Sequence, residues 1–383
     1  MQNPSTLNGT HLRASDAPNA ALTAACYVSD HLLDQESDAL FRTQWFCVGR
    51  ADIVAEKGAY ISLDIAGQAI ILLRDRQGTL RAFANACRHR GARLVEGEGR
   101  CTGLRCPFHS WMFHLDGSLA AAPHMDEVDG FSREDHALTA YRVEERLGFV
   151  FICLNRDAPD LDTQLGNFAD LHAPWPMEEL KALRRREMIV GCNWKAFLEV
   201  FNEYYHLPFV HPDTVNDIYQ KPDPGDDATG AFASQFGGTD GTGGLLQTEQ
   251  EKALPMMPGL TGRAAQGVRY SWVFPNTTFA ASSDALWMYE AYPMGPDTCR
   301  VVQTACFPSE TLDADGMEPK LSAYLNRLDA AIDEDIPALE NQQRGLKCAD
   351  AQPSLLHPLL ESNVAAFASW YADAMTRSER TSA

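Results

Sequence analysis

Residues 87–91 read Cys-Arg-His-Arg-Gly, and residues 106–111 read Cys-Pro-Phe-His-Ser-Trp. Each stretch contains one cysteine and one histidine, so that Cys87 and His89 form one pair and Cys106 and His109 form the other. Soft thiolate ligands suit iron–sulfur clusters, whereas imidazoles suit iron or zinc. The two pairs therefore predict a metal centre held by two loops, around which this part of the chain must fold.

Two kinds of metal centre use two cysteines and two histidines. In a Rieske [2Fe–2S] centre, two cysteines hold one iron and two histidines hold the other. In a structural zinc site of the finger type, the two cysteines stand together in the sequence and the two histidines follow together. Because each loop here supplies one residue of each kind, the pattern favours a Rieske cluster. Its ligands would be Cys87, His89, Cys106 and His109.

Short apolar runs separated by turn residues surround the two loops. Five such runs are Phe46–Val48, Tyr60–Leu63, Ala69–Leu73, Leu80–Phe83 and Phe149–Leu154. Runs of this length, with Gly and Asp between them, are typical of antiparallel strands. We therefore expect a small antiparallel β domain over residues 41–155. Residues 1–40 are expected to form a lead and a short helix, with Ser37 as a helix N-cap.

Longer elements follow, and residues 156–383 are expected to form a second domain. The Gly-rich stretch Asp223–Gly244 is typical of a loop. Four strands are expected at Val268–Phe274, Thr277–Ala281, Ala285–Tyr292 and Arg300–Phe307, and one long helix over Pro319–Leu346. Strands followed by helices predict an α+β fold, in which helices cover an antiparallel sheet.

A helix is also expected over Trp194–Tyr205, directly before His206. Its polar side, which includes Glu199, is most simply interpreted as solvated. Pro208 is expected to end the helix just beyond His206, and the break can swing His211 back beside His206. Two imidazoles placed so close could share a metal ion. The alternative is two unrelated histidines at the surface.

A carboxylate on the long helix could complete this site. Asp335 lies within the apolar stripe of that helix, whereas Asp333 lies outside it. A carboxylate on a buried face is costly unless it is paired or binds a metal. His206, His211 and Asp335 would then form a two-histidine, one-carboxylate face that leaves open positions on Fe(II). The alternatives are Asp333 as third ligand, or a partly exposed Asp335 beside a kink at Pro337.

At these positions the sequence resembles the Rieske non-haem iron oxygenases of the ring-hydroxylating type. That family carries C-x-H-R-G and C-P-[YF]-H-x-W, as this chain does. It also carries [DE]-x2-H-x4-H after N-W-K, which matches Glu203, His206 and His211. Its third ligand precedes E-x2-Q-x-G by five residues, which matches Asp335. The resemblance implies one Rieske cluster and one mononuclear Fe(II) per subunit, with O2 as co-substrate.

The resemblance also implies a homotrimer in which each Rieske domain faces the catalytic domain of the next subunit. In the family, the carboxylate before the first histidine bridges the two metal sites, and that residue is here Glu203. Electrons are expected from a separate NAD(P)H-dependent flavin and iron–sulfur reductase. This chain has neither G-x-G-x-x-G after a strand nor ferredoxin cysteine spacing, which supports a partner protein.

Two residues depart from the commoner family pattern. Glu203 replaces Asp, which resembles the members that oxidise quaternary ammonium compounds such as carnitine and glycine betaine; neutral drift is the alternative. Glu199 stands where many members have Asn.

Aromatic residues on the expected strands are candidates for a substrate pocket. The four candidates are Tyr270, Trp272, Trp287 and Tyr289. Aromatic faces suit a trimethylammonium group, and they suit a flat aromatic substrate equally well. Ordinary core packing is the other interpretation of such strands.

Three functions fit these observations. The favoured one is a terminal oxygenase that N-demethylates or otherwise monooxygenates a quaternary ammonium compound. The second is hydroxylation, dihydroxylation or O-demethylation of an aromatic acid. The third is a non-catalytic Rieske electron carrier, which would leave His206, His211 and Asp335 without a role.

The composition narrows the range of partners. The chain has 383 residues and a net charge of −20, which repels nucleic-acid phosphates and anionic lipids. No apolar run approaches the roughly 20 residues that span a bilayer, and Met1–Asn19 contains no signal-like segment. We therefore expect a cytoplasmic protein without nucleic-acid or membrane partners.

Overall fold

The structure of the protein, a computed structural model, describes residues 12–382 and the side chains of residues 12–377. It divides into two compact units. One is Phe41–Ala158, and the other combines Met1–Leu40 with Pro159–Ala383. Part of the expected N-terminal lead, residues 1–11, lies outside the described residues.

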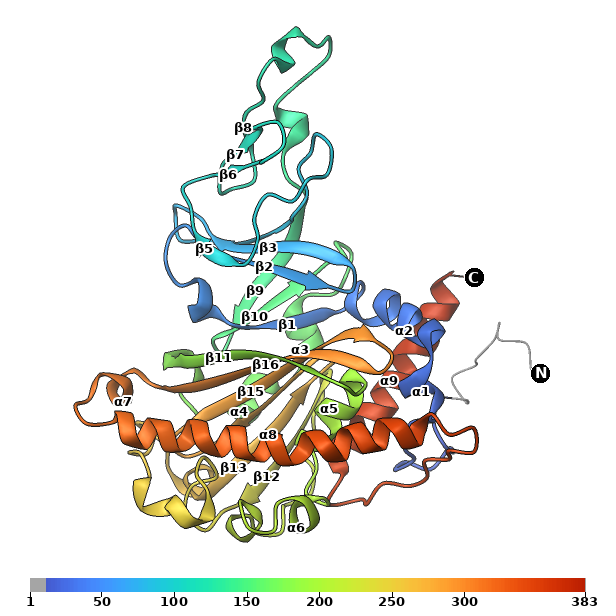
Figure 1. Ribbon diagram of the computed structural model, residues 1–383, viewed down its shortest axis with the longest axis vertical. Helices are drawn as coiled ribbons and strands as arrows, with labels where there is room; N and C mark the ends of the chain where they lie inside the picture. The colour runs from blue at the N-terminus through green and yellow to red at the C-terminus, as the bar shows by residue number, and fades with distance from the viewer. Residues whose placement is uncertain (1–11, 383) are drawn as a thin grey trace. The chain divides into compact units, whose positions relative to one another are not determined.

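An antiparallel sheet of seven strands dominates the unit Phe41–Ala158 (Figure 1). In spatial order its strands are β1 (Trp45–Arg50), β10 (Phe149–Cys153), β9 (Ala140–Arg146), β4 (Leu80–Ala84), β3 (Gln68–Arg74), β2 (Ala59–Ile65) and β5 (Glu98–Arg100). A smaller sheet contains β6 (Leu104–Arg105), β7 (Met112–Phe113) and β8 (Leu119–Ala121). All five strands expected from the apolar runs are present, so the predicted antiparallel β architecture is confirmed.

Strand β9 was missed because its sequence does not alternate between apolar and polar residues. It reads Ala-Tyr-Arg-Val-Glu-Glu-Arg, and four of its seven residues are charged. Its position depends on backbone pairing with β10 along its length and with β4 at one end. Pairing of this kind joins segments far apart in the chain and leaves no local signal.

The other unit contains an antiparallel sheet of six strands. In spatial order they are β11 (Leu180–Val190), β16 (Thr298–Pro308), β15 (Leu286–Gly295), β14 (Thr277–Ala281), β13 (Gly267–Val273) and β12 (Phe232–Gly238). Strands β12 to β16 are neighbours in both sequence and space, so the four strands expected after residue 267 are confirmed.

The expected loop Asp223–Gly244 is wrong in part, because β12 lies within it. The glycines that suggested a loop are instead required by close packing. A Cβ atom on Gly237 would lie 2.5 Å from the hydroxyl oxygen of Tyr204, and one on Gly267 would lie 2.1 Å from the carbonyl oxygen of Gly237. Glycine inside a strand often marks such an approach.

Helices cover this sheet, as the sequence predicted. The longest is α8 (Glu318–Leu346), which continues through Pro337 as one element and runs alongside the sheet in Figure 1. α5 (Trp194–Phe201) packs on β14, β15 and β16, and α9 (Ser362–Ser382) packs on β12. The shorter helices are α1 (Ala25–Val28), α2 (Asp30–Glu36), α3 (Leu161–Leu165), α4 (Phe168–His172), α6 (Leu207–Val210) and α7 (Ser309–Asp313). The α+β fold class is thereby confirmed.

The N-terminal helix begins earlier than expected. Ser29, and not Ser37, is the N-cap of α2, and its hydroxyl accepts a hydrogen bond from the backbone N–H of Leu32 at 3.3 Å. Ser37 lies at the other end of α2, where the chain continues as a π-helical turn over Ser37–Phe41. The prediction for Ser37 is wrong because an N-cap must accept a backbone N–H from its own helix.

The polar side of α5 is buried rather than solvated. Lys195 and Glu36 form an ion pair in which both side chains are almost fully buried. Glu36 also accepts hydrogen bonds from the indole N–H of Trp194 at 2.8 Å and from the hydroxyl of Tyr371 at 2.7 Å. Three segments of the chain, α2, α5 and α9, therefore meet at one carboxylate.

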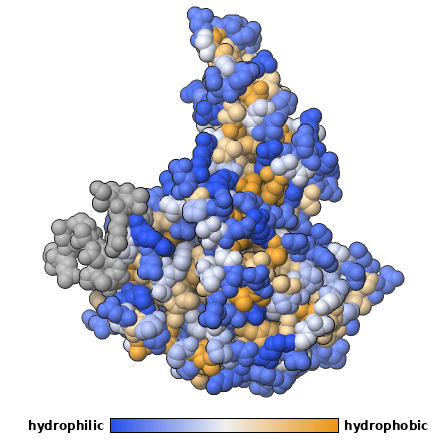
Figure 2. Space-filling model, turned by 180° about the vertical axis from the view of Figure 1, so that it is seen from behind, coloured by the Kyte–Doolittle hydropathy of each residue, from blue (hydrophilic) through white to orange (hydrophobic). Residues whose placement is uncertain are grey.

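The face of the molecule in Figure 2 is mostly hydrophilic, with apolar side chains in small groups. This pattern is ordinary for a folded surface. Among the described residues, no helix is both long enough and apolar enough to cross a bilayer.

Candidate metal centres and substrate cavity

The two loops with the predicted cluster ligands have the same backbone design. In each loop, the cysteine carbonyl accepts a hydrogen bond from the backbone N–H four residues later (Gly91 or Ser110). The backbone N–H of the cysteine donates to the carbonyl five residues later (Ala92 or Trp111). These distances are 2.9 and 2.8 Å around Cys87, and 3.1 and 2.8 Å around Cys106. The fourth residues, Gly91 and Ser110, both have positive φ angles, of 75° and 60°. The loops thus present their side chains in matching ways.

The four predicted ligands meet between these loops. The thiols of Cys87 and Cys106 are buried in a hydrophobic core to which both sheets of this unit contribute, whereas the rings of His89 and His109 are exposed. The Nδ1 atoms of the two rings lie 3.1 Å apart. Two buried thiols and two convergent surface imidazoles fit the two-cysteine, two-histidine donor set of a Rieske cluster.

Aromatic residues surround the histidine side of this centre. The indole of Trp111 stacks on the ring of His89, with centroids 5.0 Å apart and planes 11° apart. Phe108 is 58% exposed and lies beside His109, with ring centroids 3.8 Å apart.

The histidines of the second predicted site flank a short helix. α5 ends at Phe201, earlier than expected, so Glu203 and His206 lie in a turn. His206 directly precedes α6, and His211 directly follows it. Pro208 lies in the first turn of α6, where a missing N–H costs little. The expectation that Pro208 ends a helix is therefore wrong, because it begins one.

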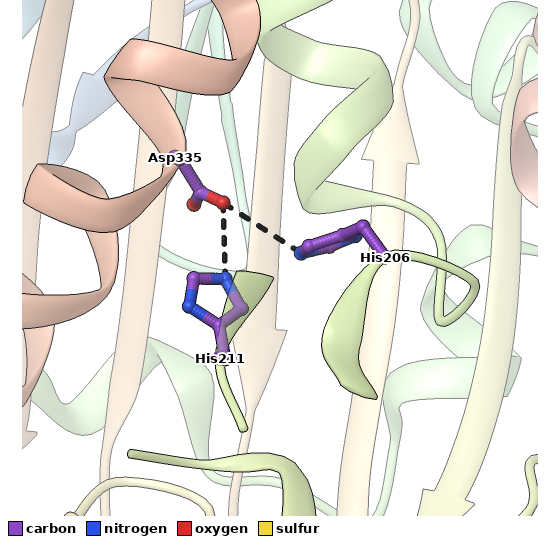
Figure 3. Close-up of side chains that lie close together, drawn as sticks. All are labelled: His206, His211 and Asp335. Carbon is purple, nitrogen blue, oxygen red and sulfur yellow. Dashed lines mark ion pairs between the residues drawn. The ribbon is translucent and has the colours of Figure 1, made fainter. Parts of the chain in front are cut away.

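His206, His211 and Asp335 converge, as Figure 3 shows. Oδ1 of Asp335 lies 3.0 Å from Nε2 of His211 and 3.7 Å from Nε2 of His206. All three candidate ligand atoms lie within 4.8 Å of one another. Asp335 arrives from the middle of α8, whereas the alternative ligand Asp333 is exposed.

A divalent metal ion fits this arrangement. Oδ1 of Asp335 is buried and has no hydrogen-bond partner, so a cation would satisfy an oxygen that the protein leaves unpaired. Two imidazoles and one carboxylate are the donor set of non-haem Fe(II) oxygenases. No other group of three His, Cys, Asp or Glu side chains among the described residues is close enough to hold one ion in this way.

In each histidine of the site, the ring nitrogen Nδ1, which faces away from Asp335, contacts a glutamate. Glu203 accepts from Nδ1 of His206 and, at 3.0 Å, from the backbone N–H of the same residue. Glu334 lies 2.6 Å from Nδ1 of His211. Carboxylates in this position orient the ring and make its other nitrogen a better ligand. Glu334 was missed because the sequence does not distinguish it from the neighbouring acidic residues.

The surrounding carboxylates raise the pKa of His206. Burial is the largest influence and lowers this pKa, but the hydrogen bond to Glu203 and the charges of Glu203 and Asp335 outweigh it. The site therefore carries a surplus of negative charge, which a metal cation would neutralise.

A cavity with an empty volume of about 500 Å³, partly open to solvent, adjoins the three side chains. Its wall includes the carboxylates of Glu203 and Asp335. Five aromatic rings and one guanidinium also line it: Phe201, Tyr204, Tyr219, Tyr270, Tyr289 and Arg327. Concave sites lined by aromatic side chains and a few polar groups are typical of small-molecule sites.

Two of the four predicted pocket residues, Tyr270 and Tyr289, line this cavity, whereas Trp272 and Trp287 do not. All four project from one face of the sheet, since Trp272 and Tyr289 both align with Thr278 and the others lie two residues along the same strands. The strand pattern alone therefore could not separate them.

The helices that cover the sheet decide which aromatic residues reach the cavity. Trp272 stacks on Phe367 of α9, with centroids 3.9 Å apart, and its indole N–H donates to the carbonyl of Pro275. Trp287 is covered by Arg327 of α8, whose guanidinium carbon lies 4.9 Å from the ring centroid. The pocket assignment of these two tryptophans is therefore corrected.

Arg327 is the lining residue that sequence reasoning missed most clearly. Arg327, Ala331 and Asp335 all line the cavity and follow one another at steps of four residues in α8. Residues at this spacing share one side of a helix. The spacing from the predicted ligand Asp335 could have identified Arg327.

Glu199, the second unusual residue, lies outside this cavity. Its carboxylate accepts a hydrogen bond from the hydroxyl of Tyr27 at 2.7 Å and lines a neighbouring cavity. Burial raises the pKa of Glu199 to about 7, despite the opposing effects of Tyr27 and Lys195.

Two family models match the chain in series. The Rieske [2Fe–2S] domain matches residues 44–132, and the ring hydroxylating alpha subunit (catalytic domain) matches residues 177–377. The chain therefore belongs to the Rieske oxygenases with a ring-hydroxylating alpha-subunit catalytic domain. It is an oxidoreductase, and the family implies a Rieske cluster and a mononuclear iron as cofactors.

Similar proteins carry more specific names. The chain is 29% identical over 326 residues to the carnitine monooxygenase oxygenase subunit of Acinetobacter baumannii, covering 84% of each chain. It is 27% identical over 375 residues to the glycine betaine monooxygenase oxygenase subunit of Chromohalobacter salexigens, covering 89% of this chain and 82% of the relative.

Solved structures agree with the fold. A quaternary ammonium Rieske monooxygenase matches with a TM-score of 0.80 at 25% identity, covering 97% of this chain and 99% of the other. A naphthalene 1,2-dioxygenase matches with a TM-score of 0.76 at 18% identity, covering 94% and 92%. The second likeness shows the shared fold alone.

Proposed function

We propose that this protein is the oxygenase component of a monooxygenase that acts on a quaternary ammonium compound. The observation that carries the proposal is the aromatic cavity beside His206, His211 and Asp335. A trimethylammonium group has no hydrogen to donate, so aromatic faces and nearby carboxylates are its natural partners. The names of the relatives, carnitine and glycine betaine monooxygenase subunits, support the same substrate class.

The residues of this chain would have the following roles. Cys87, His89, Cys106 and His109 would hold the cluster, and His206, His211 and Asp335 would hold the iron. When bound, the iron would activate O2 with electrons that the cluster supplies singly. The aromatic rings would bind the cationic head, exclude water and orient one methyl group towards the iron ligands.

The proposed reaction is balanced by two external electrons. One oxygen atom of O2 enters a C–H bond beside the nitrogen and forms C–OH, and the other leaves as water with two electrons and two protons. The N–CH2OH group then releases formaldehyde and a proton, leaving a tertiary amine. We propose that the electrons come from a separate NAD(P)H-dependent reductase.

Glu203 has the contacts of a bridging residue. Its carboxylate binds Nδ1 of His206 and borders the cavity, while the cluster histidines His89 and His109 are exposed beside the exposed Phe108. We propose a homotrimer in which Glu203 links His206 to a cluster histidine of the neighbouring subunit. Native mass spectrometry would detect three chains of 383 residues; a monomer with full activity would contradict the proposed homotrimer.

We also propose a cytoplasmic location, which cell fractionation would test.

Turnover with a surrogate reductase tests the proposed function. The reconstituted protein is incubated with NADH, O2 and a panel of γ-butyrobetaine, carnitine, glycine betaine, choline and benzoate, and products are read by mass spectrometry. We expect O2 uptake with formaldehyde or an aldehyde from at least one methylammonium compound. The proposal is wrong if only benzoate is oxidised. Oxidation of none, by a protein with both metal centres loaded, would favour the electron carrier.

A further inference from the structure

Arg327 occupies an unusual position in the cavity wall. It is 95% buried, since only 5% of it is exposed, and its Nε has no hydrogen-bond partner. The described residues provide it with no ion pair. A buried charge without a counter-charge is strongly unfavourable unless a partner arrives from elsewhere.

The neighbours of Arg327 are neutral groups. Its Nη2 donates to the hydroxyl oxygen of Tyr219 at 3.0 Å, and that hydroxyl lies 2.6 Å from the hydroxyl of Tyr270. Burial raises the pKa of Tyr270 well above its usual value, so this phenol stays neutral. The indole of Trp287 packs against the guanidinium. These contacts position the guanidinium but leave its charge unmatched.

A carboxylate is the ligand that this geometry suits best. A guanidinium presents several N–H donors in a planar fork that matches the two oxygens of a carboxylate. Because Arg327 borders the cavity, an anion in the cavity could approach its guanidinium. The field there is strong, because little water surrounds the group to screen it.

The cavity wall contains charges of both signs. Arg327 and Asp335 are eight residues apart on α8, which places them about 12 Å apart along the helix axis. Glu203 adds a second carboxylate near Asp335. A zwitterion would place its cationic head against the aromatic rings of the wall and its carboxylate against Arg327, whereas a simple cation would leave the charge of Arg327 without a partner.

We infer that Arg327 binds a carboxylate of the substrate, so that the enzyme selects trimethylammonium carboxylates over simple trimethylammonium cations. The inference deepens the proposed function and rests on it for the cationic half of the ligand. The anionic half rests on Arg327 alone. A substrate without a carboxylate would leave the guanidinium buried and unpaired, which is the kind of mismatch that produces strong discrimination.

Binding measurements on a matched pair of ligands test the inference. γ-Butyrobetaine and its methyl ester have the same head group and nearly the same shape, but the ester lacks the carboxylate. We expect calorimetry on the unmodified, metal-loaded protein to give a Kd for the ester at least tenfold higher. Equal Kd values would overturn the inference. This comparison needs no variant, so it holds even if changes at Arg327 impair folding.

Variants of Arg327 then test whether this residue causes the preference for the carboxylate ligand. Arg327→Gln is expected to weaken binding of γ-butyrobetaine at least tenfold and to leave the ester nearly unchanged, while Arg327→Lys should retain part of the preference. Arg263→Gln is the control, because Arg263 pairs with Asp223 at 2.8 Å outside the cavity wall. A preference that persists in Arg327→Gln would assign the carboxylate to another residue and overturn the inference.

The experiment separates this inference from the proposed function. If neither γ-butyrobetaine nor its ester binds, the substrate class is wrong. Benzoate and its methyl ester are then compared in the same way. A preference for benzoate that Arg327→Gln abolishes would retain Arg327 as a carboxylate site, whereas equal binding or no binding of both would reject it.

Discussion

Asp333 and Asp335 show how position decides the role of an acidic residue. The two lie on the same helix, yet Asp333 is exposed while Oδ1 of Asp335 is buried beside two imidazoles and accepts no hydrogen bond. The helix period of about 3.6 residues turns them to different sides. Only one of them is placed to be a metal ligand.

Exchange of each residue for Asn should separate these roles. We expect Asp335→Asn to lower the iron content from three per chain to two, since the cluster iron is unaffected, and to reduce turnover at least 100-fold. Asp333→Asn should leave both quantities unchanged. Iron analysis and the visible spectrum of the cluster measure the outcome. Three irons in Asp335→Asn would exclude Asp335 as a required ligand.

Burial of Glu199 makes the free energy of unfolding depend on pH. Its pKa rises from 4.5 in the unfolded chain to about 7 in the folded protein because it is buried. Below about pH 4.5 it is protonated in both states and costs nothing. Between about pH 4.5 and 7 this carboxyl ionises in the unfolded chain but stays protonated in the folded protein. The free energy of unfolding therefore falls as the pH rises through this range.

Glu199→Gln should therefore stabilise the protein at high pH alone. At about 1.4 kcal/mol per pKa unit, the gain in unfolding free energy at pH 8 should be up to about 3 kcal/mol, while at pH 4.5 it should be close to zero. Gln can still accept the hydrogen bond from Tyr27. Urea unfolding at both pH values measures the difference. An equal effect at both would show that ionisation of Glu199 is not the cause.

At the scale of elements, one carboxylate holds three helices together. Glu36 ends α2, Trp194 and Lys195 begin α5, and Tyr371 belongs to α9. All three donors converge on Glu36 in a region without solvent access. This network positions the first turn of α5, and with it the start of the segment that carries the proposed iron ligands His206 and His211.

Lys195→Met should be strongly destabilising, because it leaves Glu36 charged and buried. A broken buried pair costs about 3 to 5 kcal/mol, which urea unfolding would detect. The double variant Lys195→Met with Glu36→Gln should recover much of the loss. Lys252→Met is the control, since Lys252 pairs with Glu249 at the surface and its loss should matter little. Equal losses in both single variants would contradict the role of burial.

At the scale of the whole molecule, the two proposed metal centres belong to different compact units of the chain. The proposed cluster ligands Cys87 and Cys106 belong to the core of Phe41–Ala158, where they pack with residues such as Trp111 and Phe113. The proposed iron ligands belong to the other unit. All ten cysteines are free thiols in the structure, so no disulfide stabilises the unit Phe41–Ala158. We expect a bound cluster to stabilise this unit, because a bound metal contributes its binding energy to folding.

Loss of the cluster should therefore loosen one unit and spare the other. In Cys87→Ser, hydrogen exchange should accelerate around both cluster loops and β6–β8, while β13–β16 and α8 keep their protection. The protein should still bind one Fe(II) per chain. Mass spectrometry of exchanged peptides locates the change. Loss of protection throughout the six-stranded sheet would show that the units do not fold independently.

The sequence by itself predicted the two cofactors and their candidate ligands. Cysteine and histidine spacing predicted the cluster loops, because the candidate ligands of each loop lie within a few residues of one another. The same holds for His206 and His211, which are separated by one turn of α6. Apolar runs identified most strands and the long helix, because period 2 and period 3.6 are local properties.

Tertiary structure alone decided which residues surround the proposed iron site. Trp272 and Tyr289 share a face of the sheet, and only the packing of α8 and α9 assigns one to the core and the other to the cavity. Glu334 and Arg327 acquired their roles by meeting His211 and Tyr219, more than 100 positions away. Such meetings depend on how the helices close over the sheet, which no local pattern records.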